Sequence, residues 1–357
     1  MKHESGMETK QPTRILITRL SHIGDCILTL PVLSAIRSQY PDAFIAWAVE
    51  SPSQKLLRLH PDLDEIIMIP KGWVCKPKCW SQVAKKLRSF KFDIAIDPQG
   101  ITKSALLGWI SGARIRVGIR GRWGRELSPI LNNRFVETKS AHVVDRSMEL
   151  LAAVGVQGAY LESRRTDLPL CEQAVNTMAA WISKAGLVEP FAVINPGGSW
   201  ASKRWEMERY GSVASYLKQH YQIPSVIVWA NDEELEMANS IHSVDSEATI
   251  IAPATSLTEL AALTNRSAFF VGGDTGPLHL AVSSGTPCVG LYGTTRPEES
   301  GAYGSEHLSI QKWYQAGSCR ERRSAENDAM RDIHPRDVFQ ACDEMIEKLG
   351  LKCRSVA

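Results

Sequence analysis

Residues 269–281 read FFVGGDTGPLHLA, and this stretch decides the fold. An apolar run of strand length ends in Gly272 and Gly273, and Pro277 is well placed at the first position of a following helix. A strand followed directly by a helix is the unit from which a parallel sheet with crossover helices is built. The start of a helix carries unpaired N–H donors and a partial positive charge, so residues 275–278 would face an anion.

This helix start is the first candidate binding site, and its residues are Asp274, Thr275, Gly276, Pro277, Leu278 and His279. His279 would add a side-chain donor in the first turn; the alternative is a hydrogen-bonded core histidine. The spacing does not match G-x-x-x-x-G-K-[ST], so a P-loop nucleotidase is not indicated. Gly118, Gly121 and Gly124 lack the G-x-G-x-x-G spacing, so a nicotinamide-binding fingerprint is absent.

The same alternation of strand and helix extends outward from this stretch over most of the chain. Strands are expected at residues 15–20, 43–49, 66–69, 93–97, 116–119, 192–195, 225–229, 249–252, 268–271 and 288–292. Helices are expected at residues 25–39, 54–59, 81–90, 103–110, 142–154, 207–220, 233–243, 257–264 and 278–284.

Two such sets predict an α/β protein with two Rossmann-like, doubly wound domains that face a cleft. The expected boundaries are 14–165 for the first domain and 190–335 for the second. A final helix within 336–350 is left open between packing in the second domain and packing back on the first, because sequence position alone does not decide this.

The composition is that of an ordered globular protein. The chain has 357 residues, with 41 Lys+Arg against 39 Asp+Glu and a formal net charge of +2. Disorder is excluded, and a general nucleic-acid binder is disfavoured because it would need a large basic excess. Residues 1–14 are polar, and no run of about 18 apolar residues occurs, so we expect a cytoplasmic protein.

The eight cysteines are scattered through the chain. Cys75 and Cys79 have a metal-like spacing, but no second pair of comparable spacing completes a tetrahedral site. We therefore expect incidental or structural thiols and no metal site.

The turn after the first expected strand carries Ser21, Gly24 and Asp25. Loops after the carboxyl ends of strands are where open α/β sheets bind ligands. One interpretation of Asp25 is a helix N-cap, since Asp is among the best capping residues. The other is a general base that takes a proton from an attacking hydroxyl group, kept ionised by the helix start.

A second turn, residues 195–205 (NPGGSWASKRW), follows the first strand of the second half. Small residues allow close backbone approach to a phosphate, and Lys203 would supply a point charge. Ser199 is a candidate phosphate-contacting hydroxyl. The alternative is a plain turn with a solvated Lys-Arg pair.

Basic residues are concentrated in two windows of the first half. Residues 71–91 hold seven Lys or Arg and no acid, and residues 114–125 hold five Arg and no acid. The candidate contacts to an anionic acceptor are Lys85, Lys86, Arg120 and Arg122. Trp73, Trp80, Trp109 and Trp123 lie in or near the windows and are candidates to stack on sugar rings or sit at a lipid surface. The alternative is a solvated face with structural tryptophans.

Three segments together resemble glycosyltransferase family 9, the bacterial ADP-heptose:lipopolysaccharide heptosyltransferases. They are residues 20–25 (LSHIGD), 195–205 and 273–279 (GDTGPLH), and residues 97–100 (DPQG) also match. Each follows an expected strand, and all occur in the family's order over about residues 14–349. Many members carry a late cysteine-rich stretch, but here only Cys319 remains near it.

The resemblance implies a GT-B fold and an inverting, metal-independent transfer of heptose from ADP-heptose, without a cofactor. Asp25 resembles the catalytic base, and Lys203 resembles the lysine that balances the leaving diphosphate. Asp274, Thr275, Gly276 and His279 resemble the donor-binding loop and helix start. An acid at Glu233 or Glu234 would hold the donor's ribose; the alternative is a simple pattern of acids at a helix start.

The implied acceptor is an anionic, lipid-linked saccharide of the Kdo-lipid A type in the lipopolysaccharide inner core. We therefore expect a monomer in peripheral contact with the cytoplasmic face of the inner membrane, with no nucleic-acid partner. Two alternatives remain open: a nucleotide-sugar epimerase or hydrolase of the same fold, and a non-catalytic sugar-nucleotide-binding protein.

Overall fold

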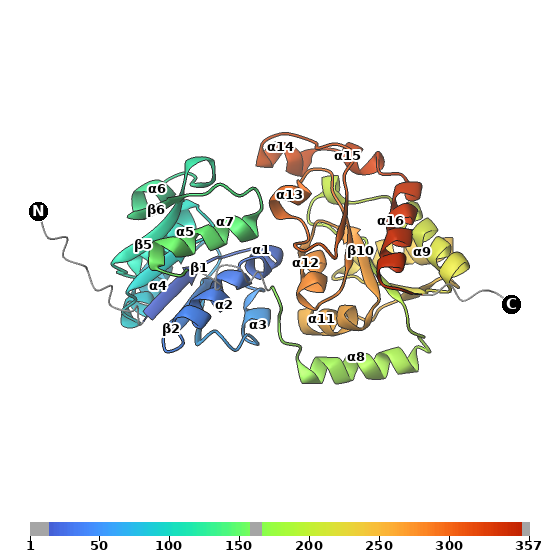
Figure 1. The fold of residues 1–357 in the computed structure, drawn as a ribbon, viewed down its shortest axis with the longest axis horizontal. Coiled ribbons are helices and arrows are strands. Elements are labelled where there is room, and N and C mark those ends of the chain that lie inside the picture. The colour runs from blue at the N-terminus through green and yellow to red at the C-terminus, as the bar shows by residue number, and fades with distance from the viewer. Residues whose placement is uncertain (1–13, 158–165, 352–357) are drawn as a thin grey trace, which may run out of the picture. The chain divides into compact units, whose positions relative to one another are not determined.

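The computed structural model describes residues 14–157 and 166–351 in two compact units. Unit 1 comprises the described residues within Met1–Ser21, Thr29–Ser140 and Asp145–Arg165, and unit 2 comprises those within His22–Leu28, Ala141–Val144 and Thr166–Ala357. The expected domain end at residue 165 lies outside the described residues. Figure 1 colours the first half of the chain blue to green and the second yellow-green to red.

Unit 1 is built on a six-stranded parallel sheet in the order β3-β2-β1-β4-β5-β6. Its strands are β1 (Arg14–Thr18), β2 (Phe44–Val49), β3 (Glu65–Met68), β4 (Ile94–Asp97), β5 (Ile115–Arg120) and β6 (Arg134–Glu137). Its helices include α2 (Leu30–Gln39), α3 (Gln54–Leu57), α4 (Pro77–Ser89), α5 (Thr102–Ile110) and α6 (Ser128–Leu131). Central strands are apolar along their whole length because helices cover both faces of a doubly wound sheet.

Unit 2 repeats this plan with the sheet order β12-β11-β10-β7-β8-β9, also parallel. Its strands are β7 (Ala192–Asn195), β8 (Ser225–Ile227), β9 (Thr249–Ile251), β10 (Phe269–Gly273), β11 (Cys288–Leu291) and β12 (Leu308–Ile310). Its longer helices are α8 (Glu172–Lys184), α9 (Met207–Tyr221), α10 (Asp232–Val244), α11 (Leu257–Arg266), α12 (Gly276–Ser283) and α16 (Pro335–Lys348). Its shorter ones are α1 (Ile23–Ile27), α13 (Pro297–Ser300), α14 (Cys319–Ser324) and α15 (Asp328–Arg331), and α7 (Val143–Glu149) begins in it.

The two doubly wound sheets confirm the expected fold class. Two strands were not expected, β6 and β12, and both lie at sheet edges. Their side chains are only partly buried, so neither shows the apolar run that marks a central strand. The expected helix at residues 25–39 is divided into α1 and α2 at Leu28 and Thr29.

The final helix, α16, packs in unit 2 and not back on the first domain. Val338, Cys342 and Met345 are buried in the core that α16 shares with α9. The carboxylate of Asp343 accepts hydrogen bonds from the hydroxyl groups of Tyr216 (2.9 Å) and Tyr221 (2.7 Å). Together the apolar face and the two tyrosines hold this helix to the unit that contains the 269–281 stretch. Among the described residues, no helix is long and apolar enough to cross a membrane.

Candidate active site

The site in unit 2 lies where β7 and β10 run side by side. The chain passes from β7 through β8 and β9 on one flank, then crosses to β10 on the other, so β7 and β10 flank the topological switch point. Gly272 pairs with Asn195 across these strands. A Cβ atom on Gly272 would lie 2.9 Å from the Asn195 carbonyl oxygen, so glycine allows the close approach. Open α/β sheets bind ligands at this point.

The start of α12 follows β10 directly, as the sequence predicted. Thr275 is the N-cap residue, and Pro277 stands in the first turn. Asn195 donates a hydrogen bond from Nδ2 to Thr275 Oγ1 (3.3 Å), which ties the helix start to β7. Leu278 is fully buried, so its side chain belongs to the core and only its backbone faces the helix start.

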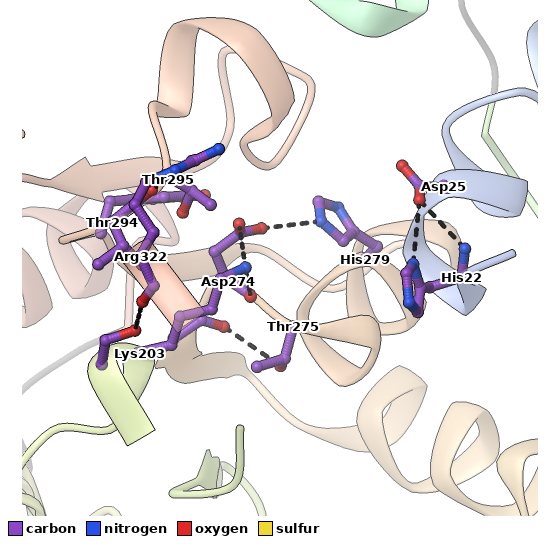
Figure 2. Close-up of polar contacts among 12 residues, drawn as sticks. His22, Asp25, Lys203, Asp274, Thr275, His279, Thr294, Thr295 and Arg322 are labelled. Atoms are coloured by element: carbon purple, nitrogen blue, oxygen red, sulfur yellow. Dashed lines mark hydrogen bonds and ion pairs between the residues drawn. The ribbon is translucent and has the colours of Figure 1, made fainter. Parts of the chain in front are cut away.

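Asp274 is the electrostatic centre of the site (Figure 2). Lys203 Nζ donates to Asp274 Oδ2 (2.9 Å) and to the Asp274 carbonyl oxygen (3.0 Å). His279 Nε2 lies 3.2 Å from Asp274 Oδ1. The side chains of Lys203, Asp274 and His279 are 14%, 8% and 6% exposed, so Asp274 makes these contacts in a largely dehydrated environment, where electrostatic interactions are strong.

These contacts decide the charge of Asp274. Burial alone would raise the pKa of a carboxyl group, since it penalises the charged form. The Lys203 ammonium and the hydrogen bond with His279 outweigh burial and hold the pKa of Asp274 well below its usual range. Asp274 is therefore a carboxylate across the physiological pH range, and it compensates much of the charge that Lys203 presents.

The turn between β7 and Lys203 presents both polar and aromatic groups. Ser199 is exposed, and residues 201–203 form a short 3-10 turn, η5. Lys203 Nζ also lies 4.8 Å from the ring centroid of Trp200, which is partly exposed. A Cβ atom on Gly273 would lie 3.0 Å from the Lys203 carbonyl oxygen, so this turn packs closely on the end of β10.

The two candidate ribose-binding acids have different surroundings. Glu233 is exposed and forms an ion pair with Arg204, whose two terminal nitrogens, Nη1 and Nη2, each donate to a carboxylate oxygen. Glu234 folds back to accept a hydrogen bond from the Ala230 N–H (2.9 Å). A Cβ atom on Gly197 would lie 2.4 Å from Glu234 Oε1, so Glu234 reaches the turn after β7.

Asp25 is not the N-cap of α1, so that interpretation is wrong: His22 is the N-cap, and Asp25 stands at the third helical position, where it completes a capping box. Its carboxylate accepts a hydrogen bond from the His22 N–H (3.1 Å) at the start of α1, and its side chain remains 35% exposed. The helix α1 groups with unit 2 and packs on α12: a Cβ atom on Gly24 would lie 2.4 Å from His279 Cδ2. Figure 2 shows Asp25 beyond His279, on the neighbouring helix.

In unit 1, the loop after β4 supports the turn after β1. The Leu20 N–H donates to Gln99 Oε1 (2.9 Å), and Arg19 Nη1 donates to the Pro98 carbonyl oxygen (3.1 Å). Buried Asp97 accepts from the backbone N–H groups of Gln99 (3.2 Å) and Gly100 (3.0 Å). Residues 97–100 therefore shape the segment that leads to Asp25.

The basic windows lie in unit 1, and their charged groups are solvent-accessible. Lys85 and Lys86 are exposed on α4, and Arg120 and Arg122 are exposed at and just after the end of β5. Trp73 is fully buried and packs against Trp80 at 5.3 Å, so its proposed role at a sugar or lipid surface is wrong and Trp73 is a core residue. Trp109 is 50% exposed, and Trp123 lies under the guanidinium groups of Arg122 and Arg146.

Sequence reasoning missed one group beside Asp274. Thr294 and Thr295 follow β11, and Arg322 comes from α14 (Figure 2). A Gly-Thr-Thr run directly after an apolar strand was a usable signal, because every strand end of this sheet opens on the same edge. Arg322 carried no comparable signal, since it is far away in sequence and stands in a generally charged segment.

Two parallel, doubly wound sheets in one chain, with a helix start at the switch point of the second, are the architecture of the GT-B fold. A family model described as "Glycosyltransferase family 9 (heptosyltransferase)" matches residues 80–330, and the chain belongs to this family. It is therefore a glycosyltransferase, as the sequence motifs predicted.

Individual relatives agree with this assignment. The lipopolysaccharide core heptosyltransferase OpsX of Haemophilus influenzae is 29% identical over 304 residues, which cover 83% of each chain. The crystal structure of a family 9 glycosyl transferase from Veillonella parvula has 25% identity and a TM-score of 0.80, covering 96% of this chain and 99% of that one. The E. coli heptosyltransferase WaaC with ADP-2-deoxy-2-fluoro heptose has 21% identity and a TM-score of 0.71, covering 93% of this chain and 99% of that one, and shares the fold.

Proposed function

We propose that this enzyme transfers a heptose from ADP-heptose to an anionic, lipid-linked acceptor of the lipopolysaccharide inner core, with inversion at the anomeric carbon. The observation that carries the donor half is Lys203 beside the start of α12, a cation and a helix dipole at one switch point. The proposed sugar and acceptor class are supported by the name of a relative, a lipopolysaccharide core heptosyltransferase.

In the proposed reaction, Asp25 takes the proton of the acceptor hydroxyl group as its oxygen bonds to the anomeric carbon. The bond between that carbon and the β-phosphate oxygen breaks, and ADP leaves with the electron pair. Lys203 and the backbone N–H groups at the start of α12 stabilise the charge that develops on the diphosphate. We propose that this fixed positive charge stabilises the leaving diphosphate without a metal ion or cofactor.

The remaining donor contacts follow from the same geometry. Ser199 is exposed in the turn before Lys203, where its hydroxyl group would contact a phosphate oxygen. Of the two acids, Glu234 is the better ribose ligand, because it reaches Gly197 while Glu233 is engaged by Arg204. Vicinal ribose hydroxyls suit a carboxylate, which accepts hydrogen bonds through both oxygens.

We propose that Lys85, Lys86, Arg120 and Arg122 attract the anionic acceptor, and that a monomer works peripherally at the cytoplasmic face of the inner membrane. Support comes from two acid-free basic windows in a chain of net charge +2, with all four side chains exposed. Basic groups next to an anionic leaflet raise the local concentration of enzyme at its lipid-linked substrate.

The test is Asp25→Asn, assayed for ADP release and for the mass of the glycosylated acceptor. The amide oxygen can still accept the hydrogen bond from the His22 N–H, so the cap survives while the base is lost. We expect transfer to fall by at least about 100-fold with ADP affinity unchanged. Near-native turnover would show that Asp25 serves only the capping box.

The chain offers a matched control. Asp337 caps α16 in the same arrangement, with its carboxylate accepting from the N–H of His334 three residues earlier (2.9 Å). Asp337→Asn removes a capping charge far along the chain and should leave turnover within about twofold, since cap substitutions act on stability. A parallel melting-shift screen of ADP, GDP and UDP identifies the base, because a ligand that binds only the native state raises apparent stability.

A further inference from the structure

Three buried polar atoms gather beside Asp274: Thr294 Oγ1, Thr295 Oγ1 and Arg322 Nε. Thr295 lies close enough to the Asp274 carboxylate to help lower its pKa. Thr294 Oγ1 and Arg322 Nε have no hydrogen-bond partner among the described residues, and Thr294 is fully buried. Native proteins leave few buried polar groups unpaired, since each costs about 1–3 kcal/mol when its partner is missing. Two such atoms in one cluster therefore point to a ligand.

Hydrogen bonds hold the three residues in place without using these two atoms. Arg322 Nη1 donates to the Thr294 carbonyl oxygen (2.7 Å), and Gln311 Nε2 donates to the Thr295 carbonyl oxygen (2.7 Å). Ser202 Oγ donates to the Arg322 carbonyl oxygen (2.6 Å), which links the cluster to the residue next to Lys203. The backbone is thus fixed by hydrogen bonds, and the Thr294 hydroxyl group and Arg322 Nε remain available to a ligand.

The order of strands shows which part of the donor the cluster would meet. Across the sheet, the loops follow β8, β7, β10 and β11 in that spatial order. Glu234 follows β8 in the first turn of α10, Lys203 follows β7, the start of α12 follows β10, and Thr294 and Thr295 follow β11. Neighbouring strands lie about 4.8 Å apart, so the loops span about 14 Å from β8 to β11. With ribose at β8 and diphosphate between β7 and β10, the next group along this edge is the sugar.

The chemistry of the cluster suits a polyol better than a second phosphate. Arg322 Nε can only donate, the two threonine hydroxyls can donate or accept, and the Asp274 carboxylate can only accept. Sugar hydroxyls need both kinds of partner. An ionised phosphate only accepts hydrogen bonds, so it could not use the accepting capacity of the Asp274 carboxylate.

We propose that Thr294, Thr295 and Arg322 form a subsite that binds the hydroxyl groups of the transferred sugar. This inference rests on the proposed donor and extends it, because it assigns the sugar's specificity to the β11 loop and α14. A site built to hydrogen-bond a hydroxyl group discriminates strongly against ligands that lack it.

The experiment measures the affinities of the full-length protein for ADP and for ADP-heptose by calorimetry, without acceptor. Thr294→Val replaces a hydroxyl group with a methyl group of similar volume. It should weaken ADP-heptose binding about 3- to 10-fold and leave ADP binding unchanged, as expected for one lost hydrogen bond. Arg322→Lys keeps the cation but loses Nε, and should weaken ADP-heptose binding selectively by about tenfold or more.

Stability measurements separate a binding role from a structural one. Because Thr294 Oγ1 has no partner to lose, Thr294→Val should melt at or above the wild-type temperature. The matched control is Thr264→Val in α11, where the buried hydroxyl group donates to the Leu260 carbonyl oxygen (2.9 Å). That variant should melt lower and keep the wild-type ratio of the two affinities.

Each outcome decides the proposal. Selective loss of ADP-heptose affinity supports the sugar subsite. Equal loss for ADP and ADP-heptose would overturn it in favour of a phosphate or structural role, and no loss for either would mean that the three atoms hold only water. If the wild-type protein bound ADP but gained nothing from the heptose, or bound neither ligand, the proposed donor itself would fail and the subsite with it.

Discussion

The ion pair between Lys203 and Asp274 makes the sharpest prediction, tested by Asp274→Asn. The substitution keeps the shape of the side chain and removes its charge. Lys203 would then keep only neutral partners: the asparagine amide oxygen, the backbone carbonyl oxygen of residue 274 at 3.0 Å and the face of Trp200. The Lys203 side chain is only 14% exposed, so solvent replaces the carboxylate poorly.

The expected loss in the free energy of unfolding follows from this burial. Removing one partner of a buried ion pair costs about 3–5 kcal/mol, because the other charge stays uncompensated. The retained carbonyl acceptor places the expected loss at the lower end, about 3 kcal/mol. For a domain of about 150–250 residues, this corresponds to a fall in melting temperature of about 6–12 °C.

The assay is calorimetric unfolding of the full-length variant without nucleotide. The control is Glu189→Gln, which breaks an ion pair with Arg266 whose side chains are 46% and 44% exposed, and it should cost less than about 1 kcal/mol. The double variant Lys203→Met with Asp274→Asn removes both charges, so it should be less destabilised than the sum of the single changes. If Asp274→Asn unfolded within about 0.5 kcal/mol of the wild type, the buried-pair argument would be refuted.

The pH dependence gives an independent check. The pKa of Asp274 is lower in the folded protein than its unfolded value of about 3.9, because Lys203 and His279 favour the carboxylate. The folded state therefore gains stability above the unfolded pKa and loses it as the pH falls towards the folded pKa. The stability difference between the wild type and Asp274→Asn should be constant between about pH 6 and 8 and shrink below about pH 5. A stability difference that stayed constant down to pH 3 would contradict a lowered pKa of Asp274 in the folded protein.

Two further predictions concern the substrates. Lys203→Ala should weaken ADP binding about 10- to 100-fold, because it removes a charge-assisted contact and leaves the Asp274 carboxylate facing the diphosphate; unchanged ADP affinity in calorimetry would exclude this role, and Lys312→Ala, which removes a partly exposed lysine paired with Asp337, is the control. Reversing Lys85 and Lys86 to Glu should raise the acceptor KM several-fold at low salt and leave the donor KM unchanged, with the difference shrinking at high ionic strength. Reversing Lys184 on α8 and Lys348 on α16 together changes the net charge by the same amount and is the control, and an effect on the donor KM alone would refute an acceptor patch.

The sequence predicted the central architecture because buried strands of a parallel sheet must be apolar along their length. β4, β7 and β10 show such runs, and they were found within about two residues. The edge strand β6 reads RFVE, with both ends charged and exposed, so its hydrogen bonds to β5 could not be inferred from hydrophobicity. An edge strand is hydrogen-bonded to one neighbouring strand only, and its hydrophobic pattern gives little indication of that pairing.

The candidate site shows a second limit of prediction from sequence. Motifs pointed to Asp25, Lys203 and the start of α12 as candidates, but they did not predict which side chains contact one another. Lys203 and Asp274 are 71 residues apart, and nothing local indicates that one neutralises the other. For Asp25, the contact with the His22 N–H is local and could be predicted from the sequence. The packing of α1 on α12 could not, because it depends on Gly24 fitting against the His279 ring, far away in the sequence.

What places these residues together is the strand order, which differs from the chain order. The chain visits β7, β8, β9, β10 and β11, whereas the sheet places β8, β7, β10 and β11 side by side. β7 and β10 become neighbours because the chain crosses the sheet after β9, so Lys203 at one strand end meets Asp274 at the other. The same crossing puts the end of β11 next to the proposed diphosphate site, on the side away from β8. A linear ligand laid along this edge is therefore met in the order ribose, phosphates, sugar, and a substitution at Thr294 should alter the choice of sugar while leaving the nucleotide's affinity intact.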